Sequence, residues 1–227
     1  MTGQDGISVI VPTITGRKDL HARTVAALTA TVPAGLLEVI TVRDRPCIGR
    51  AWNDGARAAT RRLMMLAADD IEPSPGWYEA AALAVETGWV PSPRITHPDG
   101  VLHNCGTMGG GALLGECPTG TVCSSSPFPV FPVALRDAVF PVPDIHYWAD
   151  DFVSWALRTA GMDVRVIREF EVRHLEGTVG RDRMVQRSAR DRLAFLDAVR
   201  ERAAQQDRQA YLAAYAAAAR ADQEDPA

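Results

Sequence analysis

The sequence predicts an α/β fold in which a mixed, mostly parallel central sheet is flanked by helices and followed by a helical carboxyl-terminal extension. Two patterns lead to this fold class. Apolar, β-branched runs alternate with segments of helical periodicity through residues 7–67, and from Arg181 onward the chain is charged and helix-forming. Strand, helix, strand, helix, strand in one continuous stretch is typical of half of a doubly wound sheet.

The first half-sheet is predicted from apolar runs that end at turn residues. The apolar run 63–67 reads as a strand buried on both faces, as parallel strands covered by helices are. The predicted elements are strand 7–11, helix 17–31, strand 37–42, helix 49–62 and strand 63–67. Right-handed crossovers place the carboxyl ends of these strands at one edge of the sheet. That edge then carries Thr13, Thr15, Asp44, Asp69 and Asp70.

The remainder of the α/β part alternates less regularly. Residues 92–126 are rich in Gly, Pro, Ser and Cys, which predicts a hairpin around Asp99-Gly100 and then a mobile glycine-rich binding loop. We expect residues 1–178 to form the α/β domain and residues 179–227 the helical extension. The other predicted elements are helix 77–87, a strand from 88, strand 128–133, helix 134–140, helix 152–160 and strands 163–167 and 170–174.

Composition argues against several classes of function. A net charge of -4 gives no reason to expect a nucleic-acid partner or an acidic lipid surface. No apolar run approaches the ~20 residues that span a bilayer, and residues 1–6 lack the regions of a signal peptide. The four cysteines form no CxxC pair, which indicates free thiols in a reducing compartment. We therefore expect a cytoplasmic protein without a membrane span.

Two adjacent carboxylates, Asp69 and Asp70, follow the apolar run 63–67 directly. Acids at the carboxyl end of such a strand lie in the crevice where open α/β sheets bind ligands. Hard oxygen ligands suit Mg²⁺ or Mn²⁺, and such an ion can hold phosphates. No glycine-rich phosphate loop follows the first strand, so a metal would have to take that role. The alternative is a polar turn that caps the next helix.

A second acid pair, Asp150-Asp151, opens the predicted helix 152–160. Acids at this position are expected as simple helix caps. A carboxylate there can also act as a general base. The helix amino terminus would lower the pKa of Asp150, whereas the neighbouring Asp151 and burial beside Tyr147 and Trp148 would raise it.

In their order along residues 7–177, these motifs resemble the family 2 glycosyltransferases of the GT-A fold. The strand "ISVIVPT" is similar to the opening strand of that family, and "GRAWNDGARAATRRLMMLAADDIEPSPGW" to its helix, strand, acidic motif and proline turn. "HPDGVLHNCG" resembles the hairpin of rhamnosyltransferase-like members, and "WADDFVSWALRTAGMDVRVIREFEVRH" the acidic helix and closing histidine.

This resemblance implies a role for each matching residue. Asp70 and His174 would bind Mn²⁺ or Mg²⁺, and Asp69 would contact the ribose of the donor or support the metal. Pro12, Thr13 and Asp44 fall where the family holds the nucleobase and ribose, and Asn53 falls on a typical family position in the donor-binding half. Asp150 would be the general base, with Asp151 beside it in the catalytic group. Tyr147 and Trp148 would stack on an acceptor sugar or simply pack in the protein.

The implied activity is an inverting transfer of a sugar from a UDP-, GDP- or TDP-sugar to a sugar or other hydroxyl acceptor. The chain departs from the family pattern at Ala68, Arg43, Trp52 and Ala149. Ala68 and the altered loop after the second strand motivate an alternative, a non-catalytic nucleotide- or carbohydrate-binding module on a degenerate transferase scaffold. A Mg²⁺-dependent nucleotidyltransferase or phosphohydrolase would use the same acids. The carboxyl-terminal helices offer a surface for a homodimer.

Overall fold

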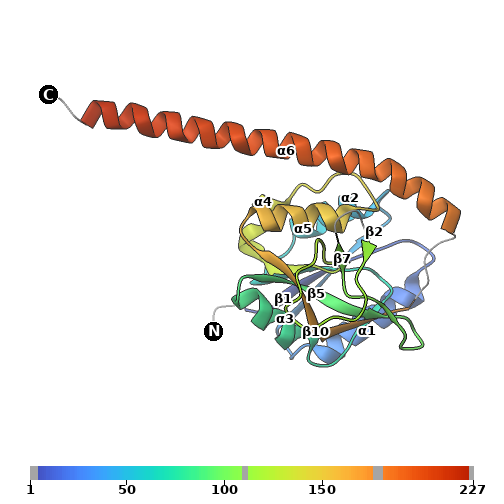
Figure 1. Ribbon diagram of the computed structural model, residues 1–227. Coiled ribbons are helices and arrows are strands. Elements are labelled where there is room, and N and C mark those ends of the chain that lie inside the picture. Colours follow the sequence, from blue (N-terminus) through green and yellow to red (C-terminus); the bar gives the residue numbers. More distant parts are fainter. Residues whose placement is uncertain (1–4, 109–111, 176–180, 225–227) are drawn as a thin grey trace.

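A computed structural model describes residues 5–108, 112–175 and 181–224, with side chains except those of 181–186, 208 and 210–224. Two four-stranded sheets, a small hairpin and the flanking helices make up the fold (Figure 1). Most of the buried apolar side chains belong to one core that draws on both large sheets. The predicted mixed α/β architecture with a mostly parallel sheet flanked by helices is confirmed, and its strands are divided between two sheets.

The first sheet has the strand order β2-β1-β3-β9. Strand β1 (Ile7–Thr13) lies between β2 (Leu37–Arg43) and β3 (Leu63–Leu66) and is parallel to both. Strand β9 (Val130–Pro132) closes the other side of β3 in antiparallel pairing. All four residues of β3 are buried, as its continuous apolar run predicts. The half-sheet expected from the sequence is therefore present, with its crossovers.

The two crossover helices are α1 (Lys18–Thr31) and α2 (Ile48–Ala56). Helix α2 ends six residues earlier than the predicted 62. The reason lies in the chain that follows, where the backbone N–H groups of Thr60 and Arg61 donate to the side chains of Glu38 and Ser8. These contacts hold the turn and bend that follow Ala56 against Ser8 of β1 and Glu38 of β2, so the backbone N–H groups of Thr60 and Arg61 are bonded outside the helix.

The second sheet has the order β4-β10-β5-β6. Strand β10 (Asp163–His174) is parallel to β5 (Trp89–Thr96) and antiparallel to β4 (Ile71–Pro73). The sequence predicts two strands, 163–167 and 170–174, where β10 runs continuously. A register shift between Ile167 and Glu171 interrupts the pattern without ending the strand. The predicted hairpin around Asp99-Gly100 is present and joins β5 to β6 (Leu102–Asn104).

The glycine-rich stretch forms a further hairpin of β7 (Thr107–Met108) and β8 (Ala112–Leu113). Residues 109–111 of the predicted mobile glycine-rich loop lie outside the described residues. Helix α3 (Trp77–Glu86) packs between the sheets, and its Trp77 is fully buried. The Trp77 ring stacks on Phe170 of β10 at 5.4 Å, and its indole N–H donates to Thr31 at the end of α1.

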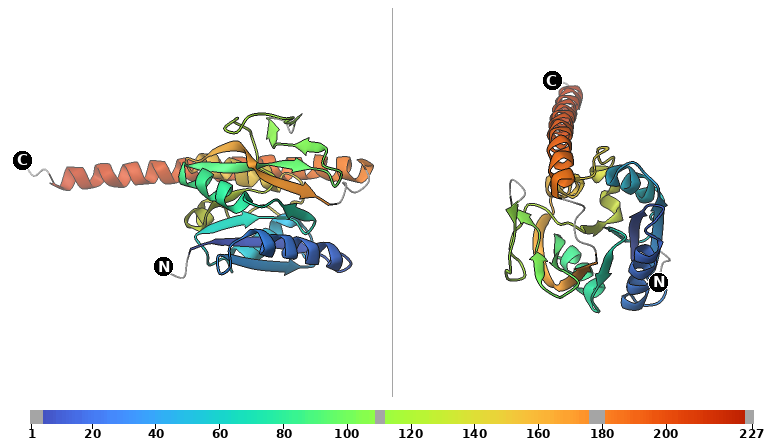
Figure 2. Two further views of the ribbon diagram at one scale, coloured as in Figure 1. Left: turned by 90° about the horizontal axis from the view of Figure 1, so that it is seen from below. Right: turned by 90° about the vertical axis from the view of Figure 1, so that its right-hand side faces the viewer.

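The remaining helices lie on one side of the α/β core. They are the turn η1 (Val133–Leu135), α4 (Arg136–Val139), α5 (Ala149–Thr159) and α6 (Arg181–Glu224). Helix α6 lies across α4 and α5, and its carboxyl-terminal part continues away from the rest of the molecule (Figures 1 and 2). None of the described helices combines the length and apolar character needed to cross a membrane.

Candidate functional site

The acid pair after β3 lies at the carboxyl edge of the first sheet, as predicted. Asp69 and Asp70 are both buried, with 6% and 7% of their surface exposed. The Thr13 hydroxyl at the end of β1 donates to Asp69 Oδ2 at 2.6 Å. The backbone N–H of Leu175 donates to the Asp70 carbonyl oxygen at 2.7 Å, which ties the end of β10 to the same edge. Buried carboxylates require such partners because desolvation penalises their charge.

Arg17 is the residue of this edge that the sequence reasoning missed. Its Nε donates to Asp69 Oδ1 at 2.9 Å, and its Nη2 donates to Asp70 Oδ2 at 2.7 Å. One guanidinium thus neutralises part of the charge of two adjacent carboxylates. A signal was present, because Arg17 directly precedes α1 and α1 follows β1 at the same sheet edge. Basic residues on that turn face the acids at the end of the neighbouring strand.

His174 contacts the oxygen of Asp70 that Arg17 leaves open. Its Nε2 lies 3.2 Å from Asp70 Oδ1. Burial would raise the pKa of Asp70, but the hydrogen bond and charge of His174, followed by those of Arg17, outweigh burial and hold that pKa below its ordinary value. Asp70 is therefore an anion at neutral pH.

Asp70 and His174 fit one edge of a divalent-cation site. Neighbouring ligands of an octahedral Mg²⁺, each at about 2.1 Å from the ion, are about 3 Å apart, which matches the 3.2 Å separation. Among the described residues, no group of three His, Cys, Asp or Glu side chains is placed to hold a metal. Asp70 and His174 are therefore two candidate ligands, and a bound cation would need phosphate oxygens and water as its others.

Two further histidines extend this cluster. His103 of β6 lies with its ring centroid 6.5 Å from that of His174, and His97 lies 4.7 Å from His103. Burial, followed by the charges of His97 and His174, lowers the pKa of His103. The sequence favours solvent exposure for lone loop histidines, but both are partly buried. The β5–β6 hairpin brings them to the end of β10, a contact that spacing alone does not encode.

The predicted nucleotide-contacting residues lie along the same edge. Pro12 and Thr13 form the end of β1, and the N–H of Asp44 donates to the Thr13 carbonyl oxygen at 2.9 Å. Asp44 is exposed, and its carboxylate accepts from the Thr15 N–H at 2.7 Å. This backbone hydrogen bond, followed by that of the Thr15 hydroxyl, lowers the pKa of Asp44. The loops after β1 and β2 are thus joined and carry an exposed anion.

The second acid pair has the opposite environment. Asp150 and Asp151 lie in the first turn of α5. Burial, followed by the charge of Asp151, raises the pKa of Asp150 from 3.8 to about 7. Burial also raises the pKa of Asp151, against a hydrogen bond with Ser125 and the charge of Arg158. No basic side chain bonds Asp150 among the described contacts, so this acid takes up a proton near neutral pH.

Helix α2 connects the two acid pairs. Its buried Trp52 donates through Nε1 to the carbonyl oxygen of Ala67, two residues before Asp69, at 3.3 Å. One turn earlier, the N–H of Gly49 donates to the carbonyl oxygen of Ile145 at 3.0 Å. A Cβ at Gly49 would collide with the Pro143 carbonyl oxygen, so glycine permits this approach. The segment that leads into α5 is thereby held at the carboxyl edge of the first sheet.

Asn53, predicted to contact the donor, lies on the same helix. Its Nδ2 donates to the Val142 carbonyl oxygen and its Oδ1 accepts from the Val142 N–H, both at 2.8 Å. Both ends of the amide are thus engaged by the segment that leads into α5. Through these bonds Asn53 links α2 to that segment. A contact between Asn53 and a nucleotide-sugar donor stays a prediction.

The aromatic residues before the second acid pair have different surroundings. Trp148 packs on α6, where its ring stacks on Phe195 at 5.7 Å. The sequence leaves open whether Trp148 stacks on an acceptor sugar or packs within the protein, and its contact with Phe195 is packing. The Tyr147 ring packs edge-on against His146 at 5.1 Å.

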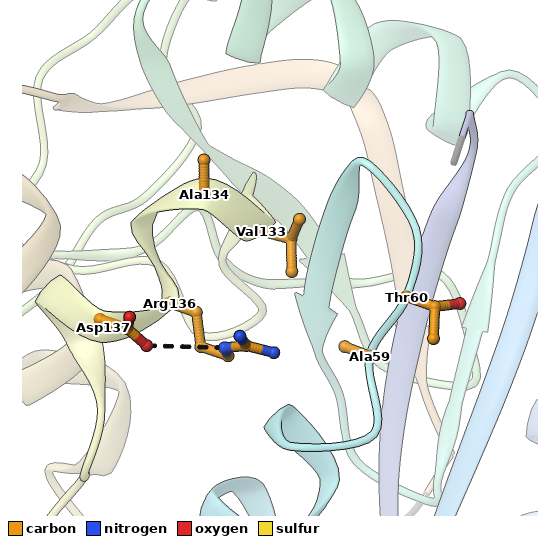
Figure 3. A pocket seen from close by; sticks show the side chains of 6 residues that line it. All are labelled: Ala59, Thr60, Val133, Ala134, Arg136 and Asp137. Carbon is orange, nitrogen blue, oxygen red and sulfur yellow. Dashed lines mark ion pairs between the residues drawn. The ribbon is translucent and has the colours of Figure 1, made fainter. Parts of the chain in front are cut away.

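A surface pocket of about 400 Å³ lies at the opposite edge of the first sheet. It is lined by residues before β3 and after β9, including Thr60, Val133, Arg136 and Asp137 (Figure 3). Because β9 is antiparallel to β3, its carboxyl end meets the amino end of β3. The pocket is therefore separated from Asp69 and Asp70 by the length of β3, and none of the predicted site residues lines it.

No protein-family model matches this chain, and no curated protein matches its sequence. Solved structures do match its fold. TarS of S. aureus aligns with a TM-score of 0.60 at 14% identity, over 75% of this chain and 37% of that chain. Its fragment 1–349 in complex with UDP-GlcNAc aligns with a TM-score of 0.61 at 13% identity, over 77% and 60%.

GalNAc-T7 with UDP, GalNAc and Mn²⁺ aligns with a TM-score of 0.60 at 13% identity, over 77% of this chain and 44% of that chain. This chain thus spans less than two thirds of the length of each of these three. Together with the sheet topology, the matches show that the chain has a glycosyltransferase fold of the GT-A type.

Proposed function

We propose that this protein is a divalent-metal-dependent glycosyltransferase similar to family 2, which transfers a sugar from a nucleoside-diphosphate sugar to a hydroxyl acceptor with inversion. One observation carries the proposal. Two acid pairs with opposite electrostatic environments are tied by α2 to the carboxyl edge of a GT-A sheet. Such a transfer needs one anionic group for the donor side and one basic group for the acceptor side.

On the donor side, Asp70 and His174 are the residues that would hold Mn²⁺ or Mg²⁺. When bound, that ion would offset the charge of the departing diphosphate. Arg17 adds a fixed positive charge beside the same acids, and Asp69 is oriented by Thr13 to support the metal or meet the ribose. Pro12, Thr13, Asp44 and Asn53 are the candidates for the nucleoside. Donors of the UDP class are favoured because two of the similar structures hold UDP or UDP-GlcNAc.

On the acceptor side, Asp150 is the candidate general base. A base works best when its pKa lies near the operating pH, because it is then both unprotonated and able to take a proton. Burial and the Asp151 charge bring the pKa of Asp150 to about 7. Asp150 would take the proton of the acceptor hydroxyl as that oxygen attacks the anomeric carbon. Asp151 would maintain the basicity of its neighbour by repulsion.

A non-catalytic nucleotide-binding module is the second candidate. One observation favours it, which is that the Arg17 guanidinium already bridges Asp69 and Asp70. An arginine there competes with a cation for the same oxygens. Such a module would bind a nucleotide or sugar without turning it over.

A thermal-shift screen tests the donor site. UDP-GlcNAc, UDP-GalNAc, GDP-mannose and TDP-glucose are each added with and without Mn²⁺. We expect the melting temperature to rise with one donor class plus Mn²⁺, because a ligand of the native state stabilises it. Asp70→Ala should abolish the rise. Asp137→Ala should keep it, since Asp137 is exposed in the pocket at the opposite edge.

Turnover then separates the two candidates. A transferase would transfer the sugar of the stabilising donor slowly to water and faster to an acceptor hydroxyl. The nucleoside diphosphate would be released in both cases. Binding without release over a long incubation favours the module. Release of inorganic phosphate or pyrophosphate with no glycoside formed would instead indicate a phosphohydrolase or nucleotidyltransferase.

Three further expectations from the sequence stay predictions. They are the domain division at residue 178, a homodimer through α6 and a cytoplasmic location.

A further inference from the structure

The turn that leads into Ala149 and Asp150 contains one residue with an unusual backbone conformation. Trp148 adopts a left-handed conformation, with φ 68° and ψ 5°, immediately before α5. Among the described residues only Asp44 shares a positive φ without being glycine. A bulky aromatic side chain disfavours this conformation, so the surroundings must impose it.

Helix α6 supplies those surroundings. Oδ2 of Asp191 accepts hydrogen bonds from the N–H groups of both His146 and Tyr147, each at 2.9 Å. The Trp148 indole N–H donates to the carbonyl oxygen and the hydroxyl of Ser188, both at 3.0 Å. A single carboxylate and a single serine thus satisfy three consecutive donors of the turn.

The aromatic face of Trp148 is also fixed by α6. Phe195 stacks on one side at 5.7 Å, and the Arg192 guanidinium lies 5.7 Å from the ring centroid. Because Ser188, Asp191, Arg192 and Phe195 fall within eight residues of α6, one face of that helix presents them together. The turn before the acid pair is therefore shaped by a single downstream helix.

The body of α5 is held in a different way. Its Phe152, Val153, Ala156 and Leu157 are buried in the core. Arg202, further along α6, donates to the carbonyl oxygens of Val139 and Phe140 at the end of α4. Loss of the Asp191 contacts would thus loosen the first turn of α5 while its buried body and the α4–α6 contacts remain.

We propose that α6 is a positioning element of the catalytic site, in which Asp191 and Ser188 hold residues 146–148 so that the first turn of α5 directs the Asp150 carboxylate. The proposal rests on the proposed function for the role of Asp150. Asp191 acts through the turn and is a positioning residue. Misplacing a reacting group by about 1 Å can lower a rate about 100-fold, so this support affects turnover more than donor binding.

Three variants of the full chain test the proposal. Asp191→Ala removes the acceptor for two N–H groups. Asp191→Asn retains an acceptor oxygen in the same place. Asp197→Ala is the matched control, because Asp197 is an exposed aspartate on the same helix whose described ion pair is with Arg200. Hydrogen–deuterium exchange of residues 144–152 is the first readout, and donor hydrolysis with UDP-GlcNAc and Mn²⁺ is the second.

We expect Asp191→Ala to speed exchange in residues 144–152 by at least 10-fold, with β1 and β3 unchanged. Its kcat should fall about 10–100-fold with KM for UDP-GlcNAc within twofold, and Asp191→Asn should recover most of both. Unchanged exchange in Asp191→Ala, or equal effects of Asp197→Ala, overturns the proposal. Faster exchange with unaltered kcat in an active enzyme also overturns it, since the turn would then have no effect on Asp150.

The two failures can be told apart. If the wild-type protein hydrolyses no nucleotide sugar, the proposed function fails, while exchange still decides whether α6 holds the turn. If the wild-type protein is active and exchange is unaffected, the proposed function stands and the positioning role fails.

Discussion

Two pairs of adjacent aspartates in this molecule have opposite surroundings. Asp69 and Asp70 are tied to Arg17, and Asp70 also meets His174, so the pKa of Asp70 is lowered. Asp150 and Asp151 are partly buried at a helix start, and the pKa of each is raised. In identical dipeptides, Asp70 is thus kept anionic whereas Asp150 can accept a proton near neutral pH.

The difference shows that neighbours, not the residue type, set the chemistry of a carboxylate. Arg17 lies 53 residues before Asp70 in the sequence, and His174 lies more than 100 residues after it. The second pair is shaped by its own helix start and by α6. Each of the following changes would strengthen or break this contrast between a pair kept anionic by cationic neighbours and a pair that accepts a proton.

The largest effect is expected from Asp150→Asn. The amide is close in shape but accepts no proton, so kcat for transfer should fall about 10²–10⁴-fold, the usual contribution of a general base. Donor affinity should be unchanged because the Asp69–Asp70 edge is intact. Initial rates and calorimetric titration of the stabilising donor measure the two quantities. A variant that retains wild-type kcat would remove Asp150 from the mechanism.

Asp70→Asn tests the other pair. It removes the charge that faces His174, and we expect Mn²⁺-dependent nucleotide affinity to fall at least about 10–100-fold. The matched substitution Asp137→Asn, at the exposed acid of the opposite edge, should leave affinity unchanged. Isothermal titration with UDP at fixed Mn²⁺ gives the dissociation constants. Equal affinity in wild type and Asp70→Asn would show that Asp70 holds no metal–nucleotide complex.

The pH profile of turnover distinguishes the pairs in one enzyme. Since a base acts in its unprotonated form, kcat/KM should rise with pH and level off above the pKa of Asp150, which is about 7. At one pH unit below that value the rate should be about tenfold lower. Because the pKa of Asp70 is lowered, its titration should not change kcat/KM above pH 4. A flat profile between pH 5 and 8 would contradict the assignment of Asp150.

The smallest effects are on stability, and the two pairs should differ in sign. The folded-state pKa of Asp150 is raised, so its contribution is fully present near pH 4 and is lost as pH rises to 7. At pH 8, Asp150→Asn should exceed the wild type in free energy of unfolding by about 1–4 kcal/mol. For Asp70 the contribution is present above pH 4 and lost as pH falls. Urea unfolding at pH 4, 6 and 8 measures both, and parallel curves for the two variants would contradict the contrast.

Local patterns in the sequence predict the amino-terminal half-sheet well. The apolar runs of β1 and β3 and the helical period of α1 are encoded by residues that are near one another, and strand ends share an edge because crossovers have one hand. The end of α2 could not be predicted in this way. It depends on Ser8 and Glu38, which bind the backbone of Thr60 and Arg61 across the sheet.

The site is predicted only in part for the same reason. Asp69, Asp70, Asp150 and His174 are found by their position at strand and helix ends and by family resemblance. Arg17, His97 and His103 are not, because their roles depend on how one loop or hairpin lies beside another. The contact of Asp191 with residues 146 and 147 joins segments 44 and 45 residues apart, and no local pattern indicates it.

The order of synthesis gives α6 a further consequence. The acid pair of α5 emerges from the ribosome well before Ser188, Asp191 and Phe195, and folding proceeds from the amino terminus during synthesis. The first sheet and its carboxyl edge, with Asp69 and Asp70, can form first, whereas the turn before Asp150 must wait for the helix that shapes it. If the proposed function holds, a nascent chain that stops short of Phe195 would bind a nucleotide before it could transfer a sugar, and the catalytic turn would form last.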